Sequence, residues 1–311
     1  MPTASGASPH RPAEIVFLGL ATLDLVVDMP RWPDRDGRLV VEPIQRAYGG
    51  PASTAAVAAT RLGTSVAFIG AVGDDEAGEL VVRALHGEGV NASLVRTMSG
   101  RTSESVILVD SSAATRSILH APGVALDRIP PQAATVVAEA GWVHVDHAGW
   151  PLAREVPPDR LSVDAGNPIA DLQLSGVGLY APTAEALRAR YPGLSLGACV
   201  RAALTDGASR VAVTLGSDGA IGADASGAWH AAPPAVPVRS TLGAGDAFHG
   251  ALVARLAAGG LFPEAIREAT SAAALSCRAL DGRGAIPTLD ELRRALASAP
   301  PVEPIVLGRI A

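Results

Sequence analysis

Short apolar runs and Ala-rich stretches with helical spacing alternate along most of the chain. The apolar runs predict buried strands over residues 14–20, 65–70, 141–146, 160–164, 177–180 and 210–215. The stretches between and after them predict helices over residues 53–62, 77–85, 131–140, 184–190, 197–204, 245–256, 263–280 and 289–297. Strands that alternate with helices are typical of an α/β fold, in which helices cover both faces of a mostly parallel sheet.

Two segments depart from this pattern. Residues 36–48 and 103–120 are rich in β-branched and polar residues, and apolar and polar positions alternate in parts of them. Such alternation predicts strands with one exposed face, so we expect a small accessory sheet. We find no internal repeat or low-complexity linker in the chain. We therefore expect a polar, disordered tail over residues 1–12 and one domain over residues 13–311.

The composition narrows the possible chemistry. All 25 basic residues are Arg, and the lack of Lys excludes a Walker A site, a protein-kinase site and Schiff-base chemistry. The net charge of −6, with Arg scattered along the chain, argues against a nucleic-acid partner. Cys199 and Cys277 are isolated, and we expect buried thiols. No stretch has the apolar length of a membrane span, so we expect a cytoplasmic protein without a membrane partner.

The strongest local motif is Thr241-Leu-Gly-Ala-Gly-Asp246, at the start of a predicted helix. The backbone N–H groups of Gly243, Ala244 and Gly245 at a helix start suit the negative charge of a phosphoryl group. Asp246 is then placed to accept the proton of a hydroxyl that attacks the phosphorus. A helix cap with glycines in its turn explains the same spacing equally well.

Two further motifs are compatible with a small-molecule ligand. A Gly49-Gly50 turn leads into a helix of small residues that includes Thr54, where a backbone can approach a ligand closely. Tight packing explains this turn more simply. Asp24 follows the first buried strand, and ligands bind in the crevice outside the carboxyl ends of parallel strands.

Two other motifs carry less information. Thr214 lies at the end of a predicted strand, and Gly216 and Gly219 lie in the turn that follows it. Such a turn can contact nucleotide phosphates, but an ordinary turn has the same pattern. His144 and His147 are three residues apart, and this spacing puts them on opposite faces of a strand. We therefore expect no metal site from this histidine pair.

Taken together and in order, these motifs resemble the ribokinase-like (PfkB) family of sugar kinases. The resemblance runs from Gly19 to Pro287, and its nearest branch is that of sulfofructose kinase and, more distantly, ketohexokinase. It implies a three-layer α/β/α domain with a mostly parallel central sheet and a small β lid. Residues 36–48 and 103–120 would form this lid, which in the family closes over the sugar and can mediate a homodimer.

The resemblance also implies the reaction, which is the Mg²⁺-dependent transfer of the γ-phosphoryl group of ATP to a sugar hydroxyl. In the family's pattern, Asp246 is the general base and the amides of Gly243, Ala244 and Gly245 form an anion hole. The substrate would contact Asp24, Gly49, Gly50 and Thr54, and the nucleotide would lie along Thr214, Gly216, Gly219 and Thr241. Arg116 and Arg38 lie in the lid segments, where each either reaches an anionic group of the substrate or stays exposed.

Three positions depart from the family's pattern. Ser240 stands where many relatives have an Asp that supports a monovalent-cation site, so we expect weak activation by K⁺. Pro182 replaces an Asn, while Glu185 keeps the carboxylate that would support Mg²⁺ through water. Thr54 stands where sugar-binding members often have Asn. The Arg that sulfofructose kinase carries near His147 is missing, so the sequence does not support a sulfonate substrate.

Two other functions fit the same pattern. The first is a nucleoside kinase of the same fold, although the aromatic content of 4% offers few side chains for stacking on a base. The second is a catalytically lapsed regulator that binds a sugar or a nucleotide, which the three departures together suggest. The sequence leaves the identity of the sugar, the hydroxyl that is phosphorylated and the oligomeric state open.

Overall fold

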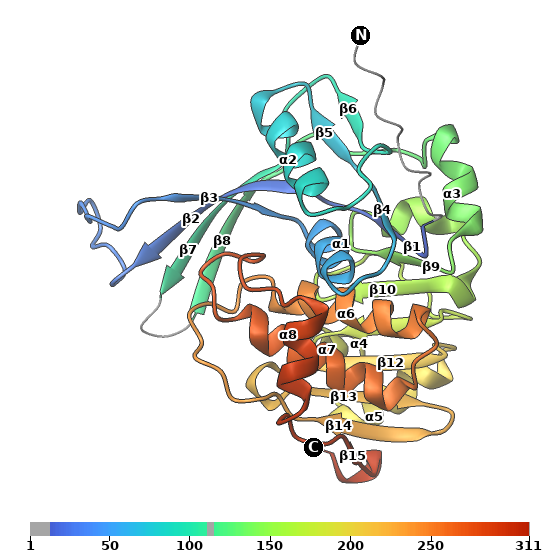
Figure 1. Ribbon diagram of the computed structural model, residues 1–311. Coiled ribbons are helices and arrows are strands. Elements are labelled where there is room, and N and C mark those ends of the chain that lie inside the picture. The colour runs from blue at the N-terminus through green and yellow to red at the C-terminus, as the bar shows by residue number, and fades with distance from the viewer. Residues whose placement is uncertain (1–12, 111–114, 311) are drawn as a thin grey trace.

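The computed structural model describes residues 13–110 and 115–310 (Figure 1). The tail expected over residues 1–12 lies outside the described residues, as do residues 111–114 of the second lid segment.

A nine-stranded sheet forms the centre of the molecule, in the order β15-β14-β13-β12-β11-β10-β9-β1-β4. The strands from β4 to β12 in this order are parallel, and β13 to β15 continue the sheet antiparallel. The strands are β1 Ile15–Leu18, β4 Val66–Ile69, β9 Trp142–Val145, β10 Leu161–Ala165, β11 Leu179–Pro182, β12 Arg210–Thr214, β13 Ala220–Asp224, β14 Gly227–Ala231 and β15 Glu303–Pro304. All six predicted buried strands are present, and their ends differ from the prediction by two residues at most.

Two separate cores explain the three layers. Ile15 and Phe17 of β1 belong to one core, whereas Val16 and Leu18 belong to the other, because successive side chains of a strand point to opposite faces. The first core includes α1 Pro51–Arg61, α2 Glu76–Gly87, α6 Ala244–Ala257, α7 Phe262–Ser276 and α8 Leu289–Leu296. The second includes α3 Ala134–Glu139, α4 Ala184–Arg190 and α5 Leu196–Thr205. The predicted α/β architecture is therefore confirmed.

The remaining helical turns are short. They are 3₁₀ turns at Pro131–Ala133, Trp150–Glu155, Pro158–Arg160, Gly216–Asp218 and Leu307–Arg309. The helix predicted over residues 131–140 begins as the first of these turns. Within residues 13–110 and 115–310, no helix is both long and apolar enough to cross a membrane. Both cysteines are buried and free.

A second sheet of four strands, here called the lid, projects from one end of the molecule (Figure 1). Its order is β3-β2-β7-β8, with β2 Thr22–Met29, β3 Gln45–Gly49, β7 Glu104–Asp110 and β8 Thr115–Ala121. A two-stranded sheet, β5 Ala71–Gly73 and β6 Arg96–Met98, lies beside α2.

The first lid segment differs from the prediction. The strand expected over residues 36–48 begins only at Gln45, and residues 30–44 form a largely exposed loop with no regular structure. Pro30, Pro33, Pro43 and Gly37 account for this, because Pro cannot donate to a strand ladder and Gly weakens a strand. The hydrophobic pattern also does not predict β2, the longest strand of the lid, or the short and antiparallel strands β5, β6, β13, β14 and β15.

Candidate active site

Three carboxylates lie where the parallel strands of the main sheet end. Asp146 directly follows β9, Asp164 lies near the end of β10, and Asp246 lies in the first turn of α6. The ends of parallel strands meet at one edge of a sheet, which is where such folds bind their ligands. Asp146 and Asp164 obey the rule that singled out Asp24 in the sequence, although they were not predicted as site residues.

The start of α6 carries small residues and has no side chain over its first backbone N–H groups. Gly243 precedes the helix with a φ of 72°, and a Cβ there would lie 2.6 Å from the carbonyl oxygen of Gly282. Only glycine fits these constraints. No side chain caps α6, a feature that it shares with α1, α3 and α7, whereas side-chain oxygens cap α2, α4, α5 and α8. A Cβ on the exposed Gly245 would meet nothing within 4 Å. The N–H of Ala244 donates to the carbonyl oxygen of Thr241 at 3.3 Å, whereas the N–H groups of Gly243 and Gly245 have no backbone acceptor among the described residues. The start of α6 thus leaves these two N–H groups available to a ligand.

Asp246 sits in this turn as a half-buried carboxylate. Burial raises its pKa well above the usual range, and the charges of Asp164 and Asp146 raise it further. Arg116 and Arg283 oppose this shift. A carboxylate with a raised pKa is a better proton acceptor at neutral pH than an ordinary Asp.

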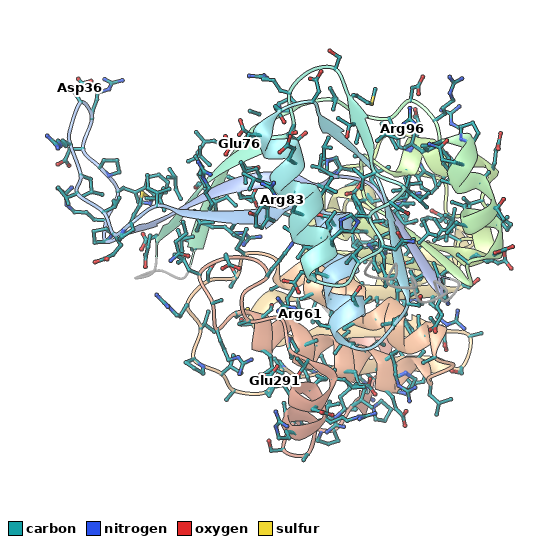
Figure 2. All side chains as sticks on the ribbon, turned by 45° about the horizontal axis from the view of Figure 1, so that its top comes forward. Asp36, Arg61, Glu76, Arg83, Arg96 and Glu291 are labelled. Carbon is teal, nitrogen blue, oxygen red and sulfur yellow. The ribbon has the colours of Figure 1, made fainter. Side chains whose placement is uncertain are left out.

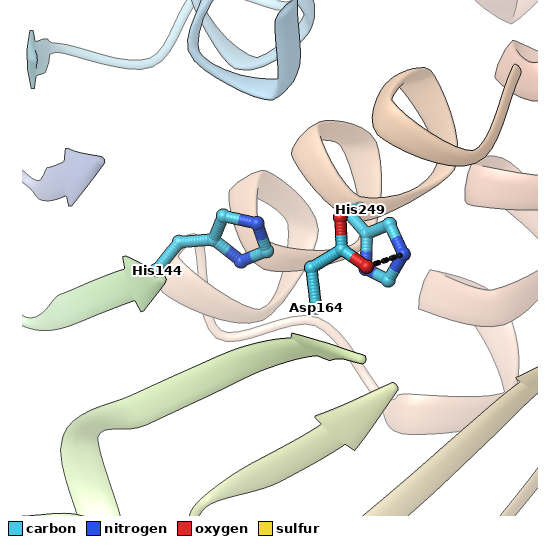
Figure 3. A group of neighbouring side chains, drawn as sticks. All are labelled: His144, Asp164 and His249. Carbon is cyan, nitrogen blue, oxygen red and sulfur yellow. Dashed lines mark ion pairs between the residues drawn. The ribbon is translucent and has the colours of Figure 1, made fainter. Parts of the chain in front are cut away.

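A buried polar cluster lies against α6 one helical turn after Asp246 (Figure 3). Nε2 of His249 lies 3.3 Å from Oδ1 of Asp164, and Nδ1 of His144 shares a hydrogen bond of 2.9 Å with Oγ of Ser162. Burial, with a smaller contribution from His249, lowers the pKa of His144 well below its usual value. The ligand atoms of His144, Asp164 and His249 lie within 4.8 Å of one another, and donors of these types bind divalent ions. His144 therefore groups with distant residues and not with His147.

Asp146 holds several loops around the site by hydrogen bonds to their backbone. Its side chain is fully buried and accepts hydrogen bonds of 2.8 to 3.2 Å from the backbone N–H groups of Leu20, Ala52, Ala148 and Gly149. These bonds join the segment between β1 and β2 to the start of α1. Burial raises the pKa of Asp146, and the bonds from Leu20, Gly149 and Ala52, together with the charge of His147, oppose the shift.

One face of the lid carries a row of polar side chains. Asp24 of β2 lies opposite Ser105 of β7, which lies opposite His120 of β8. Ser105 Oγ and His120 Nδ1 share a hydrogen bond of 3.2 Å, and Thr22 Oγ1 donates to Asp24 Oδ1 at 2.7 Å. Burial raises the pKa of Asp24, whereas the hydrogen bond from Thr22 and the charge of Arg283 lower it. Hydrogen-bonding groups in such a row suit the hydroxyls of a sugar.

The remaining predicted sugar contacts lie beside Asp24. A Cβ on Gly49 would lie 2.0 Å from Oδ2 of Asp24, and Gly50 adopts a φ of 91° at the start of α1. Thr54 is buried in α1, and its Oγ1 accepts a hydrogen bond of 3.3 Å from Nε of Arg283. The structure thus groups Asp24, Gly49, Gly50 and Thr54 around Arg283, a residue that the sequence analysis missed.

Arg116 connects the lid to the loop before α6. Its Nη1 donates to Oγ1 of Thr241 at 3.0 Å, and its charge acts on Asp246. Apolar side chains strengthen this contact, since lid residues form a small buried cluster with Leu242 and Leu280. Arg38 lies elsewhere. It is exposed on the loop of residues 30–44, whose tip at Asp36 points away from the body of the molecule (Figure 2).

The predicted nucleotide and magnesium residues lie at the ends of β12 and β11. Thr214 ends β12, and Gly216 and Gly219 follow with φ angles of 64° and 86°. A Cβ on Gly219 would lie 2.0 Å from a backbone oxygen of β14, so the turn itself requires this glycine. Nothing lies within 4 Å of a Cβ on Gly216, which therefore faces open space. Thr214 bridges to Thr183, the cap of α4, and the first turn of α4 carries the exposed Glu185.

Comparison with known proteins decides the family. Residues 12–163 and 193–289 match the description "pfkB family carbohydrate kinase". The chain belongs to this family. As a member it is a phosphotransferase with an alcohol group as acceptor.

Individual relatives of this kinase match nearly its whole length. Ribokinase from Haemophilus influenzae is 26% identical over 303 residues, which cover 92% of this chain and 99% of that protein. Ketohexokinase from Mus musculus is 27% identical, covering 85% of this chain and 96% of its own. The structure of Arabidopsis thaliana ribokinase complexed with ribose and ATP superposes with a TM-score of 0.79 at 23% identity, covering 92% and 99% of the two chains. This last likeness confirms the ribokinase-like fold.

Proposed function

We propose that this kinase transfers the γ-phosphoryl group of ATP to a hydroxyl of a sugar or sugar derivative. The observation that carries the proposal is the position of Asp246. Its raised pKa makes it a base, and it lies in the same uncapped helical turn as the amides of Gly243, Ala244 and Gly245. A base and an anion site side by side serve attack on phosphorus, whereas a capping Asp needs no raised pKa.

In the proposed step, the acceptor oxygen forms a bond to the γ-phosphorus while the bond to the β–γ bridging oxygen of ATP breaks. Asp246 takes the proton of the acceptor hydroxyl, and the bridging oxygen leaves with ADP. The amides of Gly243, Ala244 and Gly245 stabilise the charge on the phosphoryl oxygens in transit. Arg116, held at Thr241, adds a positive charge to this anion hole.

The other predicted contacts divide between sugar and nucleotide. We assign sugar hydroxyls to Asp24, Gly49, Gly50 and Thr54, which lie together on the side of the lid. We assign the nucleotide to Thr214, Gly216 and Gly219 at the end of β12. The open space beside Gly216 supports this assignment, while Gly219 acts through the turn it permits.

Magnesium would be held near Glu185. Its side chain is exposed at the carboxyl end of the sheet, and carboxylate oxygens are the donors that Mg²⁺ prefers, often with water between. When bound, the ion would neutralise phosphate charge. Activation by K⁺ is expected to be weak, because Ser240 supplies no carboxylate and its Oγ already accepts a hydrogen bond of 3.1 Å from the N–H of Leu242.

The experiment that tests the proposal is ADP release by the purified protein with Mg·ATP, with and without K⁺. The acceptors are ketoses, aldoses, sugar acids, sugar phosphates and nucleosides, and Asp246→Asn is the matched blank. We expect acceptor-dependent ADP release that the variant loses. If nucleosides alone give the signal, the alternative of a nucleoside kinase replaces the proposal. Sugar binding without ADP release under any condition favours the non-catalytic regulator.

A further inference from the structure

Arg283 is a buried charge without a paired anion. The residue is 6% exposed, and in the part of the chain that the structure describes no carboxylate lies within 4 Å of its guanidinium. Buried arginines almost always have an ion-pair partner, because an isolated charge in a protein interior is costly. The carboxylates of Asp24, Glu88 and Asp246 act on its charge from beyond this distance, so the guanidinium lacks only a direct anionic partner.

The hydrogen bonds of Arg283 leave one nitrogen free. Nε donates to Oγ1 of Thr54 at 3.3 Å, and Nη2 donates to Oγ of Ser53 at 2.7 Å and to the carbonyl oxygen of Gly49 at 3.1 Å. All three acceptors are neutral. Nη1 is buried and has no partner. A neutral hydroxyl would complete its hydrogen bonds, whereas an anionic group would also form the direct ion pair that Asp24, Glu88 and Asp246 do not make.

The backbone around Arg283 is held firmly. Nη1 of Arg61 donates to the carbonyl oxygens of Arg283 and Ile286, both at 2.8 Å, while Arg61 forms an ion pair with Glu88 at 2.7 Å. Oδ1 of Asp281 accepts a hydrogen bond of 2.8 Å from the N–H of Arg283. The guanidinium is therefore fixed in advance of any ligand, which is how specificity is built into a site.

Arg283 lies between the two ends of the proposed substrate site. Burial lowers its pKa to about 10, and the charges of Asp24 and Asp246 are among those that oppose this shift. Its loop also packs against the anion hole, since Gly282 faces Gly243. A group bound at Nη1 thus lies near both the sugar contacts and the base.

We propose that the acceptor substrate carries an anionic group, a carboxylate, phosphate or sulfonate, which binds Nη1 of Arg283 while one of its hydroxyls lies at Asp246. The inference rests on the proposed function. In this proposal Arg283, near the C-terminus, recognises the anionic group of the substrate, and the exposed Arg38 does not.

The test compares anionic sugars with their neutral parents. The pairs are gluconate against glucose, fructose 6-phosphate against fructose, and fructose with a 6-sulfonate against fructose, which separates the three anion types. For at least one pair, the wild-type kcat/KM is expected to favour the anionic member by about 100-fold or more. Arg283→Gln reduces this ratio to within about tenfold, and Arg283→Lys, which keeps the charge, restores part of it.

Three controls isolate the role of Arg283. Arg83→Gln removes an exposed positive charge on α2 and should leave the preference unchanged. Arg61→Gln keeps the guanidinium of Arg283 but loosens its loop, so it should lower the preference without abolishing it. Equilibrium binding of each pair, measured calorimetrically with Asp246→Asn, provides a readout that needs no turnover. Arg283→Gln in that background should weaken the anionic ligand selectively.

The outcomes separate the two proposals. Turnover of neutral sugars that equals that of anionic ones, with a ratio unchanged in Arg283→Gln, overturns the role of Arg283 and leaves the kinase proposal standing. Binding of an anionic sugar that needs Arg283, without Asp246-dependent ADP release, supports the anion site and overturns the kinase proposal. If no member of any pair binds or reacts, both are overturned.

Discussion

The ionised carboxylate of Asp246 lowers the stability of the folded protein. Asp246 is partly withdrawn from water and is repelled by Asp164 and Asp146, so its charged form is less stable in the folded protein than in the unfolded chain. For an acid with a raised pKa, the folded state binds its proton more tightly than the unfolded state does. Stability therefore falls as the pH rises from the usual Asp range through the pKa of Asp246.

This sign predicts the behaviour of Asp246→Asn. The variant should melt several degrees above the wild type at pH 8, and the gain should shrink as the pH falls below the pKa of Asp246, because the wild-type carboxyl is then neutral too. Its kcat should fall by about 10³-fold. Thermal melts from pH 4 to pH 8 measure the first effect. Asp127→Asn, which neutralises an exposed carboxylate, should change neither. An Asp246→Asn protein that is equally stable at all pH values would contradict the raised pKa.

The same carboxylate should set the acid limb of catalysis. The wild-type kcat/KM should rise with pH up to a plateau, with an apparent pKa above that of an ordinary Asp, since the base must be ionised before it can accept a proton. A pH profile of kcat/KM under saturating ATP measures this limb. A limb at the ordinary Asp value would show that bound substrate or ions cancel the repulsion from Asp164.

At the scale of elements, local patterns could be predicted and distant contacts could not. The six parallel strands of the main sheet, the helix α4 and the start of α6 follow from apolar spacing and glycine positions over a few residues, whereas β13 and β14 were not predicted. Arg283 meets Thr54 across 229 residues, and no local pattern marks such a pair. The lid was predicted incompletely for a related reason. The polar Asp24 marked the end of a strand in the sequence analysis, whereas in the structure it lies inside β2 with its side chain in the site.

Substitutions at two glycines at the start of α6 should affect stability and activity separately. Gly243→Ala should destabilise the fold by about 1–2 kcal/mol or more, because the left-handed backbone disfavours Ala and the new Cβ meets Gly282. Gly245→Ala should leave stability unchanged or raise it by at most about 1 kcal/mol, since its Cβ meets nothing. Yet this methyl group occupies the proposed phosphoryl site, so kcat/KM for ATP should fall by at least about tenfold. Chemical denaturation and steady-state assays give the two numbers. Unchanged turnover in a stable Gly245→Ala protein would move the phosphoryl group away from this turn.

At the scale of the whole molecule, one face of the lid packs against the body and the other is exposed. The face with Asp24 also carries Val26, Ile107 and Val109, which pack against Leu242 and Leu280 of the body. The opposite face presents a row of apolar side chains, because residues directly opposite one another in a sheet share a face. Leu25 is paired with Val106 and Val106 with Leu119, and these residues are 38%, 38% and 57% exposed. A continuous exposed apolar row is typical of an interaction surface.

We expect this row to bind the lid of a second copy of the chain, which is the homodimer that the resemblance to the family allows and that the sequence leaves open. Light scattering after gel filtration should give the mass of a dimer at micromolar concentration, and Leu25→Asp with Val106→Asp should give a monomer. Leu261→Asp, at an exposed apolar position before α7, is the matched control and should remain dimeric. A monomeric wild type, or a dimer that survives the paired substitution, would show that the second copy binds elsewhere. Since Asp24 lies one residue from Leu25 on the opposite face, loss of the dimer should also raise KM for the sugar more than KM for ATP.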